Sequence, residues 1–260
     1  MKSKTMSDRI QLEMKAGIAT LRLNRPPANA LDLQFITELG DVFTDLENRE
    51  EVGALIVTGA GRFFSAGLDL KAVPAYSSDE QRALATELNR MVGRLYGLPL
   101  PVVAAVNGHS IAGGVIVALC CDYRIAAAGD YKIGLAEARV GVPFPVAPMA
   151  VVQGELSQPA ARISVLLARN VSPQEALSQG LLDELQPAEQ LLSRANEMAE
   201  EMAALPRTSY GRIKRQMRAA ALARIDDAVN NQNDPVLDSW LNAETASASA
   251  SVLARDKAEE

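Results

Sequence analysis

The chain has 260 residues, enough for one large domain or for a core with an appendage. Apolar residues make up 48% and charged residues 22%, as in globular proteins, and the net charge of −6 argues against general affinity for nucleic acid or an anionic membrane. No apolar run is long enough to span a bilayer, and the first ten residues lack the apolar core of a signal peptide.

The first 60 residues predict a hairpin, a helix and a buried strand. "RIQLEMKAGIATLRLNRP" contains two β-rich runs around a glycine turn and stops at Pro26-Pro27. Asp32 is the expected cap of a helix whose apolar residues recur at helical spacing. These are Phe35, Ile36, Leu39, Phe43 and Leu46. "VGALIVTGAG" then predicts a buried strand that ends in a glycine turn.

The middle of the chain repeats this pattern. Ser78 and Asp79 begin a second predicted helix with Leu84, Leu88, Val92 and Leu95 on one face. "PVVAAVNG" and "YRIAAA" predict two further buried strands. Because strand, turn and helix recur with short links, the sequence indicates an α/β fold with crossover connections.

The character of the sequence changes after residue 145. "GVPFPVAP", Gly141 to Pro148, is either only a rigid loop or a loop that also shapes a substrate pocket. A helix, a short helix at Ser172-Pro173 and a small strand follow, and from Ala188 onward nearly all of the sequence favours helix. Asp234-Pro235 interrupts this region, and "AETASASAS" predicts a weak helix or a frayed end.

Residue types that are scarce narrow the possible chemistry. The single histidine, His109, would have to serve in any Ser-His-Asp triad, and a zinc site built on several histidines is excluded. The sequence lacks a CxxC pair, a P-loop and a GxGxxG motif, so we expect no metal or redox cofactor. Cys120 and Cys121 are adjacent and poorly placed to pair with each other, which favours reduced thiols and a cytoplasmic setting.

Two glycine turns are candidates for a binding site. "FFSAGLDL" follows the strand at residues 54–57, and "SIAGGVIV" follows the strand at residues 102–106. Glycine lets the backbone approach a ligand, and two converging N–H groups would form an oxyanion hole for a thioester enolate. Each turn taken alone is more often only a turn, so the pair and its flanking sequences carry the argument.

The chain resembles the crotonase superfamily of enoyl-CoA hydratases and isomerases from about Ile10 to its C-terminal helices. The resemblance is carried by "TLRLNRPPANALD", "LIVTGAGRFFSAGLDL", "PVVAAVNGHSIAGGVIVALCCDYRIAA" and "YKIGLAEARVGV". It implies a spiral of ββα turns over residues 1–195 and a helical oligomerisation region over residues 196–260. It also implies an acyl-CoA thioester substrate and a homotrimer or a dimer of trimers.

The resemblance also implies particular site residues. The backbone N–H groups of Leu68 and Gly113 would bind the thioester oxygen, and Glu137 would be the catalytic acid or base. The other residues implied to bind substrate are Ser65, Ala66, Gly67, Asp69, Leu70, Gly114 and Ile116. Coenzyme A would enter only as part of the substrate.

One departure from the family pattern narrows the expected reaction. Hydratases of the family use two glutamates, and Ile116 stands where the first is expected. A single carboxylate suits migration of a double bond from C3–C4 to C2–C3, because one base can move the proton. The sequence is similar to the mitochondrial-type Δ3,Δ2-enoyl-CoA isomerase branch, except that Ile111 replaces an expected proline. The alternatives are a hydratase-like or hydrolytic thioester reaction, and a non-catalytic acyl-CoA-binding or assembly subunit.

Other polar residues have structural interpretations beside functional ones. Asp69 is interpreted as a structural cap in preference to a catalytic acid, and we expect Asp122 and Arg124 to pair with each other inside the protein. His109 either packs beside the turn or contacts substrate, and the two cysteines are expected in the core. The basic helix near the C-terminus presents a solvated face or meets CoA phosphates. It contains Arg212, Lys214, Arg215, Arg218 and Arg224.

Overall fold

The computed structural model of the protein describes residues 7–238, 240, 245, 247, 248, 250 and 251. The strands are β1 (Ile10–Lys15), β2 (Ile18–Leu23), β3 (Ala54–Gly59), β4 (Phe63–Ser65), β5 (Val102–Val106), β6 (His109–Ile111), β7 (Tyr123–Ala127), β8 (Ile133–Gly134) and β9 (Glu184–Gln186). The α-helices are α1 (Leu33–Glu47), α2 (Ser78–Gly97), α3 (Gly113–Leu119), α4 (Val146–Glu155), α5 (Gln158–Leu167), α6 (Pro173–Ser178), α7 (Leu191–Ala203), α8 (Arg207–Met217) and α9 (Ala219–Asn230). Short 3₁₀ helices are η1 (Val73–Ala75), η2 (Glu137–Arg139), η3 (Ala188–Gln190) and η4 (Pro235–Asp238).

The strands form two sheets. The larger sheet has the order β1-β2-β3-β5-β7-β9, with an antiparallel β1–β2 pair and parallel pairs elsewhere, and the smaller sheet has the order β4-β6-β8. From β3 to β9, successive strands therefore alternate between the two sheets, and β3–β4–α2 and β5–β6–α3 are repeated ββα units. This arrangement confirms the predicted α/β fold and its ββα turns.

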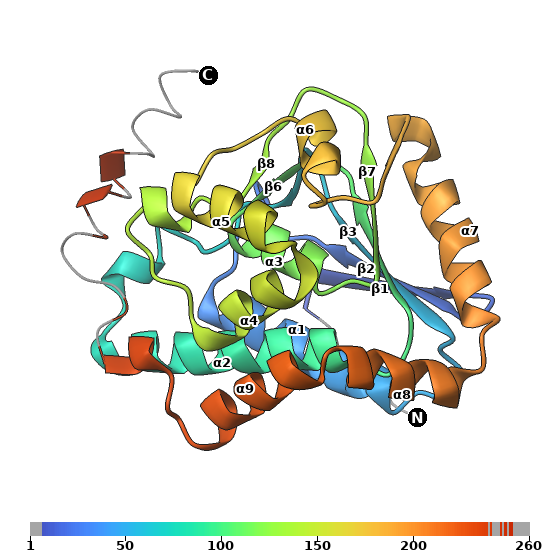
Figure 1. Ribbon diagram of the computed structural model, residues 1–260, viewed down its shortest axis with the longest axis horizontal. Coiled ribbons are helices and arrows are strands. Elements are labelled where there is room, and N and C mark those ends of the chain that lie inside the picture. Colours follow the sequence, from blue (N-terminus) through green and yellow to red (C-terminus); the bar gives the residue numbers. More distant parts are fainter. Residues whose placement is uncertain (1–6, 239, 241–244, 246, 249, 252–260) are drawn as a thin grey trace.

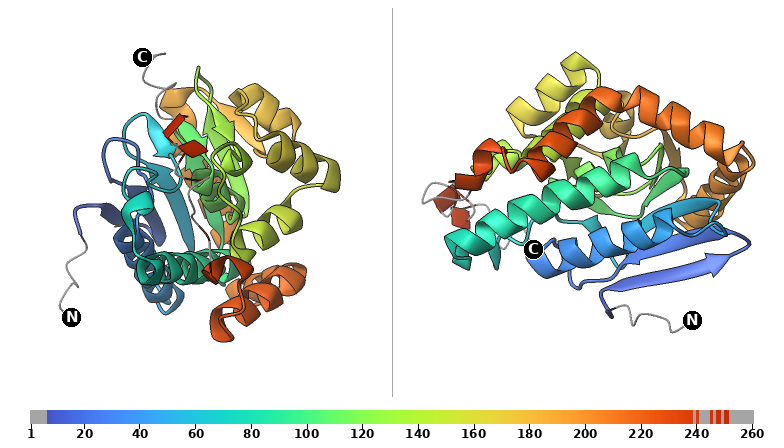
Figure 2. Two further views of the ribbon diagram at one scale, coloured as in Figure 1. Left: turned by 90° about the vertical axis from the view of Figure 1, so that its left-hand side faces the viewer. Right: turned by 90° about the horizontal axis from the view of Figure 1, so that it is seen from below.

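The core lies on both faces of the larger sheet. Every residue of β3 and β5 is buried, as expected for central parallel strands covered on both faces. Helix α7 packs on one face, against β3 and β5, and Figure 1 shows the smaller sheet and α3 on the other side. Helices α1, α2 and α9 lie side by side beneath the sheets (Figure 2). The domain boundary expected between residues 195 and 196 falls inside α7.

The predicted helices begin where their caps place them. Asp32 accepts a hydrogen bond from the Phe35 amide at the start of α1, and all five predicted apolar residues of that helix are buried. Helix α2 begins at Ser78 after a capping box between Ser77 and Glu80. Its four predicted apolar residues are buried too.

The structure differs from the sequence prediction at two turns and one loop. Phe63–Ser65 and His109–Ile111 are strands of the smaller sheet, although they were expected to be parts of the glycine turns. The loop expected to reach Pro148 ends at Pro145, because α4 begins at Val146. In the tail, the described residues from 245 to 251 are helical.

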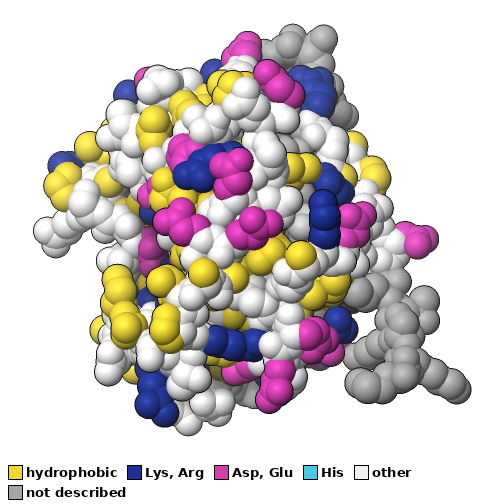
Figure 3. Space-filling view, turned by 90° about the vertical axis from the view of Figure 1, so that its right-hand side faces the viewer, with side chains coloured by type: hydrophobic (Ala, Val, Ile, Leu, Met, Phe, Trp, Pro, Cys, Tyr) yellow, Lys and Arg dark blue, Asp and Glu magenta, His cyan; other side chains and the backbone are white. Residues whose placement is uncertain are grey.

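Each helix in the part of the chain that the structure describes is too short or too polar to cross a lipid bilayer. The face that carries α7 shows hydrophobic side chains interspersed with acidic and basic ones (Figure 3).

Candidate active site

The two glycine turns touch each other. A Cβ atom added to Gly67 would lie 2.8 Å from both the amide nitrogen of Gly113 and the carbonyl oxygen of Ile111. A Cβ atom on Gly114 would lie 2.3 Å from the carbonyl oxygen of Ser65. Since real Cβ contacts are not this short, the close approach of the two turns requires glycine at both positions. The β4–β6 pairing, which joins Ser65 to Ser110, brings the turns to this contact.

The Leu68 amide is oriented by a short bridge to Leu31. The Leu31 N–H donates to the Gly67 carbonyl at 2.7 Å, and the Asp69 N–H donates to the Leu31 carbonyl at 3.0 Å. Because alternate peptide groups of an extended chain face opposite sides, the Leu68 N–H points away from Leu31. Among the described residues, the N–H groups of Leu68 and Gly113 have no hydrogen-bond acceptor. Both amides are therefore free to donate to a ligand.

Helix α3 begins with a strained residue. Ala112, which immediately precedes Gly113, has φ 51° and ψ −119°, a conformation that alanine rarely adopts. Its N–H donates to the Gly134 carbonyl at 2.8 Å, and the Val115 and Ile116 amides donate to its own carbonyl. Backbone strain of this kind is concentrated at functional sites. Here it turns the chain from β6 into α3, so that Gly113 presents its amide at the start of the helix.

Glu137 lies at the start of η2, three residues beyond the Gly134 carbonyl that binds Ala112. Three residues of chain span at most about 11 Å, so η2 begins close to the second glycine turn. The Glu137 side chain is buried and its Oε2 has no hydrogen-bond partner in the described part of the chain. Burial raises the pKa of Glu137 to about 8, while its own backbone N–H opposes that shift. A carboxyl group with this pKa can both accept and release a proton near neutral pH.

The remaining predicted site residues surround the turns. Ser65 is buried, and its hydroxyl donates to the Asn29 carbonyl and accepts from the Gly67 N–H, so it shapes the first turn. The Ala66 N–H donates to the Ala28 carbonyl at 3.0 Å. Leu70 packs against the core, and Ile116 is buried in α3. Ile116 therefore places an apolar side chain, and not a carboxylate, in the first turn of α3.

Asp69 has the structural role that the sequence favoured. Its Oδ1 accepts from the Lys71 and Ala72 amides, and its Oδ2 is 2.6 Å from Nη2 of Arg25. Burial acts to raise the pKa of Asp69, but the hydrogen bonds from Arg25 and these amides outweigh it and lower the pKa below 3.8. Asp69 is therefore an ionised residue that holds the first turn in place.

Sequence reasoning missed two residues that support the first turn. The Arg25 guanidinium also pairs with Asp32 at 2.9 Å and donates to the Ala30 carbonyl. Asn29 is buried, with φ 51°, and its Nδ2 donates to the carbonyls of Ala60, Phe63 and Phe64. Both residues lie in "NRPPANALD". Asn29 was the one local indication of a special turn there, because asparagine tolerates a positive φ better than most residues.

The expected pairing of Asp122 with Arg124 is wrong. Arg124 makes two hydrogen bonds of 2.9 Å to the Asp183 carboxylate. Asp122 instead pairs with Lys214 at 2.7 Å and with Arg218 at 3.0 Å. Lys214 and Arg218 are consequently buried, so these two members of the basic helix neither form a solvated face nor reach a CoA phosphate.

His109 and the cysteines have structural roles. The ring of His109 stacks on Phe63 with the centroids 4.8 Å apart, and its Nδ1 accepts from the Lys132 N–H. Cys120 and Cys121 are buried and unpaired, and burial raises the pKa of Cys121 to about 12. Both thiols therefore stay protonated at neutral pH and serve as core residues.

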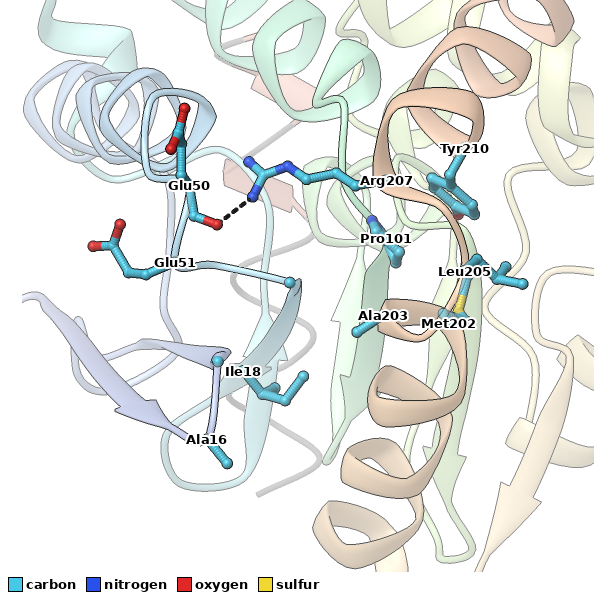
Figure 4. Close-up of a pocket in the computed structure, with 12 residues that line it drawn as sticks. Ala16, Ile18, Glu50, Glu51, Pro101, Met202, Ala203, Leu205, Arg207 and Tyr210 are labelled. Atoms are coloured by element: carbon cyan, nitrogen blue, oxygen red, sulfur yellow. Dashed lines mark hydrogen bonds between the residues drawn. The ribbon is translucent and has the colours of Figure 1, made fainter.

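A cavity of about 310 Å³ lies elsewhere, between the β1–β2 turn and the end of α7 (Figure 4). Arg207 lines it and donates to the backbone carbonyls of Arg49, Glu50 and Val52, which ties α8 to the loop before β3. None of the predicted site residues lines this cavity. The glycine turns and Glu137, which combine free donors with a buried acid, are therefore the candidate active site.

The fold and the two contacting turns define a crotonase-type protein. The family model described as enoyl-CoA hydratase/isomerase matches residues 13–252, and the chain belongs to this family of acyl-CoA enzymes. Family membership favours an enzyme over the non-catalytic subunit that the sequence left open.

Relatives and solved structures include both isomerases and hydratases. "Enoyl-CoA delta isomerase 1, mitochondrial" of Mus musculus is 33% identical, over 81% of this chain and 74% of the relative. "Short-chain-enoyl-CoA hydratase" of Clostridium acetobutylicum is 32% identical, over 74% of each chain. The crystal structure of human mitochondrial delta3-delta2-enoyl-CoA isomerase superimposes with a TM-score of 0.88 at 32% identity, over 97% of this chain and 99% of that chain.

Proposed function

We propose that the protein is a Δ3,Δ2-enoyl-CoA isomerase with Glu137 as its only side-chain acid–base catalyst. The observation that carries the proposal is the buried Glu137 carboxyl, with one oxygen unpartnered, in a site where Ile116 stands in the first turn of α3. A raised pKa suits a group that must accept a carbon-bound proton and return it.

In the proposed mechanism, the Leu68 and Gly113 N–H groups bind the thioester oxygen. The ionised Glu137 takes a proton from C2, the C2–H electron pair moves into a dienolate, and the negative charge develops on that oxygen. The two N–H groups stabilise this charge. Glu137 then returns the proton to C4, which leaves the double bond between C2 and C3. Ile116 and its apolar neighbours exclude water that would compete for the dienolate.

The decisive experiment measures double-bond migration and water addition separately on a panel of 3-enoyl-CoA and 2-enoyl-CoA substrates. We expect isomerisation to be much faster than hydration. Glu137→Gln should lower isomerisation by about a thousandfold, within the range for loss of a general acid–base. The exposed Glu201→Gln is the matched control and should keep full activity. Rapid hydration without isomerisation would contradict the proposal.

A hydratase-like activity is the second candidate, because relatives named hydratase are about as similar to the chain as those named isomerase. The substrate panel tests it directly, since a hydratase would add water rapidly to 2-enoyl-CoA. Glu137→Gln should then abolish this hydration as well. The same panel also shows which acyl chain length the enzyme prefers.

We also propose a homotrimer or dimer of trimers, in a cytoplasmic setting. Exposed apolar side chains on α8, Ile213 and Met217, support an assembly that covers them. Sedimentation analysis tests the assembly, and a monomer at micromolar concentration would contradict it. The buried, unpaired Cys120 and Cys121 support a reducing compartment.

A further inference from the structure

In the described part of the chain, no other side chain forms a hydrogen bond or an ion pair with the Glu137 side chain. Its Oε2 has no partner in the described part of the chain, and the hydrogen bond that opposes the rise of its pKa comes from its own backbone. The position of the carboxyl group therefore depends on the backbone of η2 and of the loop that follows. That loop is coupled directly to Glu137, because the Val140 and Val142 amides donate to the Glu137 carbonyl at 3.1 and 3.0 Å.

The loop from Gly141 to Pro145 has few internal means of keeping its shape. Pro143 and Pro145 have no N–H to donate, and Gly141 has a positive φ of 66°. Its carbonyls at Gly141 and Pro143 are bound by side chains from the far end of the sequence.

Two hydrogen bonds join the C-terminal segment to this loop, and a third joins it to the residue that follows the loop. The Thr245 hydroxyl donates to the Gly141 carbonyl, and the indole Nε1 of Trp240 donates to the Pro143 carbonyl, each at 2.7 Å. The Asp234 carboxylate accepts from the Val146 N–H, also at 2.7 Å, at the first residue of α4. Trp240 is 2% exposed, so its indole ring lies inside the protein.

The contact at Asp234 is itself fixed by α2. The Asn89 side chain donates to the Asp234 carboxylate at 2.7 Å and accepts from the Ala147 N–H at 2.9 Å. Asn89 and Asp234 are both buried, and together they bind the first two free amides of α4. Helix η4, which follows Asp234, packs against α2. The segment that reaches Trp240 and Thr245 is therefore anchored on a rigid helix at its start.

We propose that Trp240 and Thr245 are positioning residues, which hold the Glu137 carboxyl group at the reacting carbons by fixing the loop from Gly141 to Pro145. The inference rests on the proposed role of Glu137. Residues more than 100 positions after Glu137 in the sequence thus determine where the proton is taken and returned.

Thr245→Val tests the proposal, because valine keeps the shape of the side chain and removes the hydroxyl that donates to the Gly141 carbonyl. We expect kcat for isomerisation to fall about tenfold, with a smaller change in KM, as the carboxyl loses its alignment. Thr245→Ser keeps a hydroxyl and should restore most of the rate. Thr44→Val, which removes a hydroxyl bonded to the Gly40 carbonyl in α1, is the matched control and should keep the wild-type kcat. Trp240→Phe removes the indole donor to the Pro143 carbonyl and should also lower kcat.

A readout independent of turnover separates this inference from the proposed function. The C=O stretch of protonated Glu137 is identified in infrared difference spectra as the band that is missing in Glu137→Gln, and its titration midpoint is measured. In Thr245→Val we expect the midpoint to fall by about one unit, because a loosened loop admits water to the carboxyl. An unchanged midpoint in both Thr245→Val and Trp240→Phe would overturn the inference. A shifted midpoint in a protein that does not isomerise 3-enoyl-CoA would overturn the proposed function and leave the positioning role intact.

Discussion

Glu137 is a carboxyl group that the fold keeps away from water and from opposite charge. Its pKa of about 8 comes from burial, and a buried ionisable residue with a strongly shifted pKa is typical of a general acid–base. The sequence identified Glu137 only through the family motif. Charge, spacing and periodicity around "GLAEARVG" are equally typical of a surface acid, because burial depends on η2 and α5, which pack together only in the folded chain.

The raised pKa of Glu137 predicts how stability depends on pH. The native state holds the proton up to about pH 8, whereas the unfolded chain releases it near the usual 4.5. The stabilisation is therefore complete below pH 4.5 and is lost as the pH rises to about 8. Glu137→Gln removes this titration, so its free energy of unfolding should rise relative to that of the wild type by about 4 kcal/mol between pH 5 and pH 9.

Urea unfolding at pH 5, 7 and 9 measures this difference. Glu201→Gln, at an exposed position, serves as the control and should follow the wild type at each pH. If the free energies of unfolding of Glu137→Gln and the wild type differ by the same amount at all three pH values, the carboxyl group is already ionised at pH 5 in the native protein.

At the scale of elements, the Arg25 guanidinium ties three segments together. It joins the cap of α1, the loop at Ala30 and the turn that carries Leu68, through its contacts with Asp32, the Ala30 carbonyl and Asp69. The sequence predicted the elements well, since apolar periodicity and caps are local signals. It could not predict these connections, because Arg25 and Asp69 are 44 positions apart and nothing local relates them.

Arg25→Met should separate these segments while keeping the apolar stem of the side chain. We expect the free energy of unfolding to fall by about 2 kcal/mol, since Asp32 and Asp69 lose a mostly buried partner. Isomerisation should also fall, because the Leu68 amide loses its support. Arg22→Met is the control on β2, where the guanidinium donates only to the Gly59 carbonyl at 3.3 Å in the described part of the chain. Urea unfolding measures the loss of stability and the isomerase assay measures the loss of activity. Equal losses in Arg25→Met and Arg22→Met would contradict the role of Arg25.

At the scale of the whole molecule, a buried charge cluster joins α8 and α9 to the core. Asp122, the residue before β7, pairs with Lys214 and Arg218. Arg218 also pairs with Glu155 and lies 4.0 Å over the ring of Tyr96. From the sequence, the two cations were expected either on a solvated face, where most helical Lys and Arg lie, or at the phosphates of CoA. Only the packing of the C-terminal helices against the core shows that the i, i+4 pair faces inward.

Asp122→Asn should destabilise the protein by about 3 kcal/mol, because it leaves two buried cations without their shared counter-charge. Asp45→Asn is the matched control, since its pair with Arg49 is exposed and should contribute less than about 1 kcal/mol. Urea unfolding at pH 7 measures both. A loss in Asp122→Asn no larger than in Asp45→Asn would show that Glu155 alone balances Arg218 and that Lys214 sheds its proton.

The bond between Asn89 and Asp234 spans 145 positions of sequence, and this distance has a consequence for biosynthesis. A nascent chain cannot make the bond until Asp234 has left the ribosomal exit tunnel, although both glycine turns and Glu137 emerge much earlier. The Val146 amide at the start of α4 therefore lacks its partner until late in synthesis, whereas Asn89, the partner of the Ala147 amide, precedes α4 in the chain. We expect a polypeptide arrested between Glu137 and Asp234 to leave the start of α4 incompletely bonded and accessible to chaperones. Native protease resistance of this region should appear only after Asp234 has been translated.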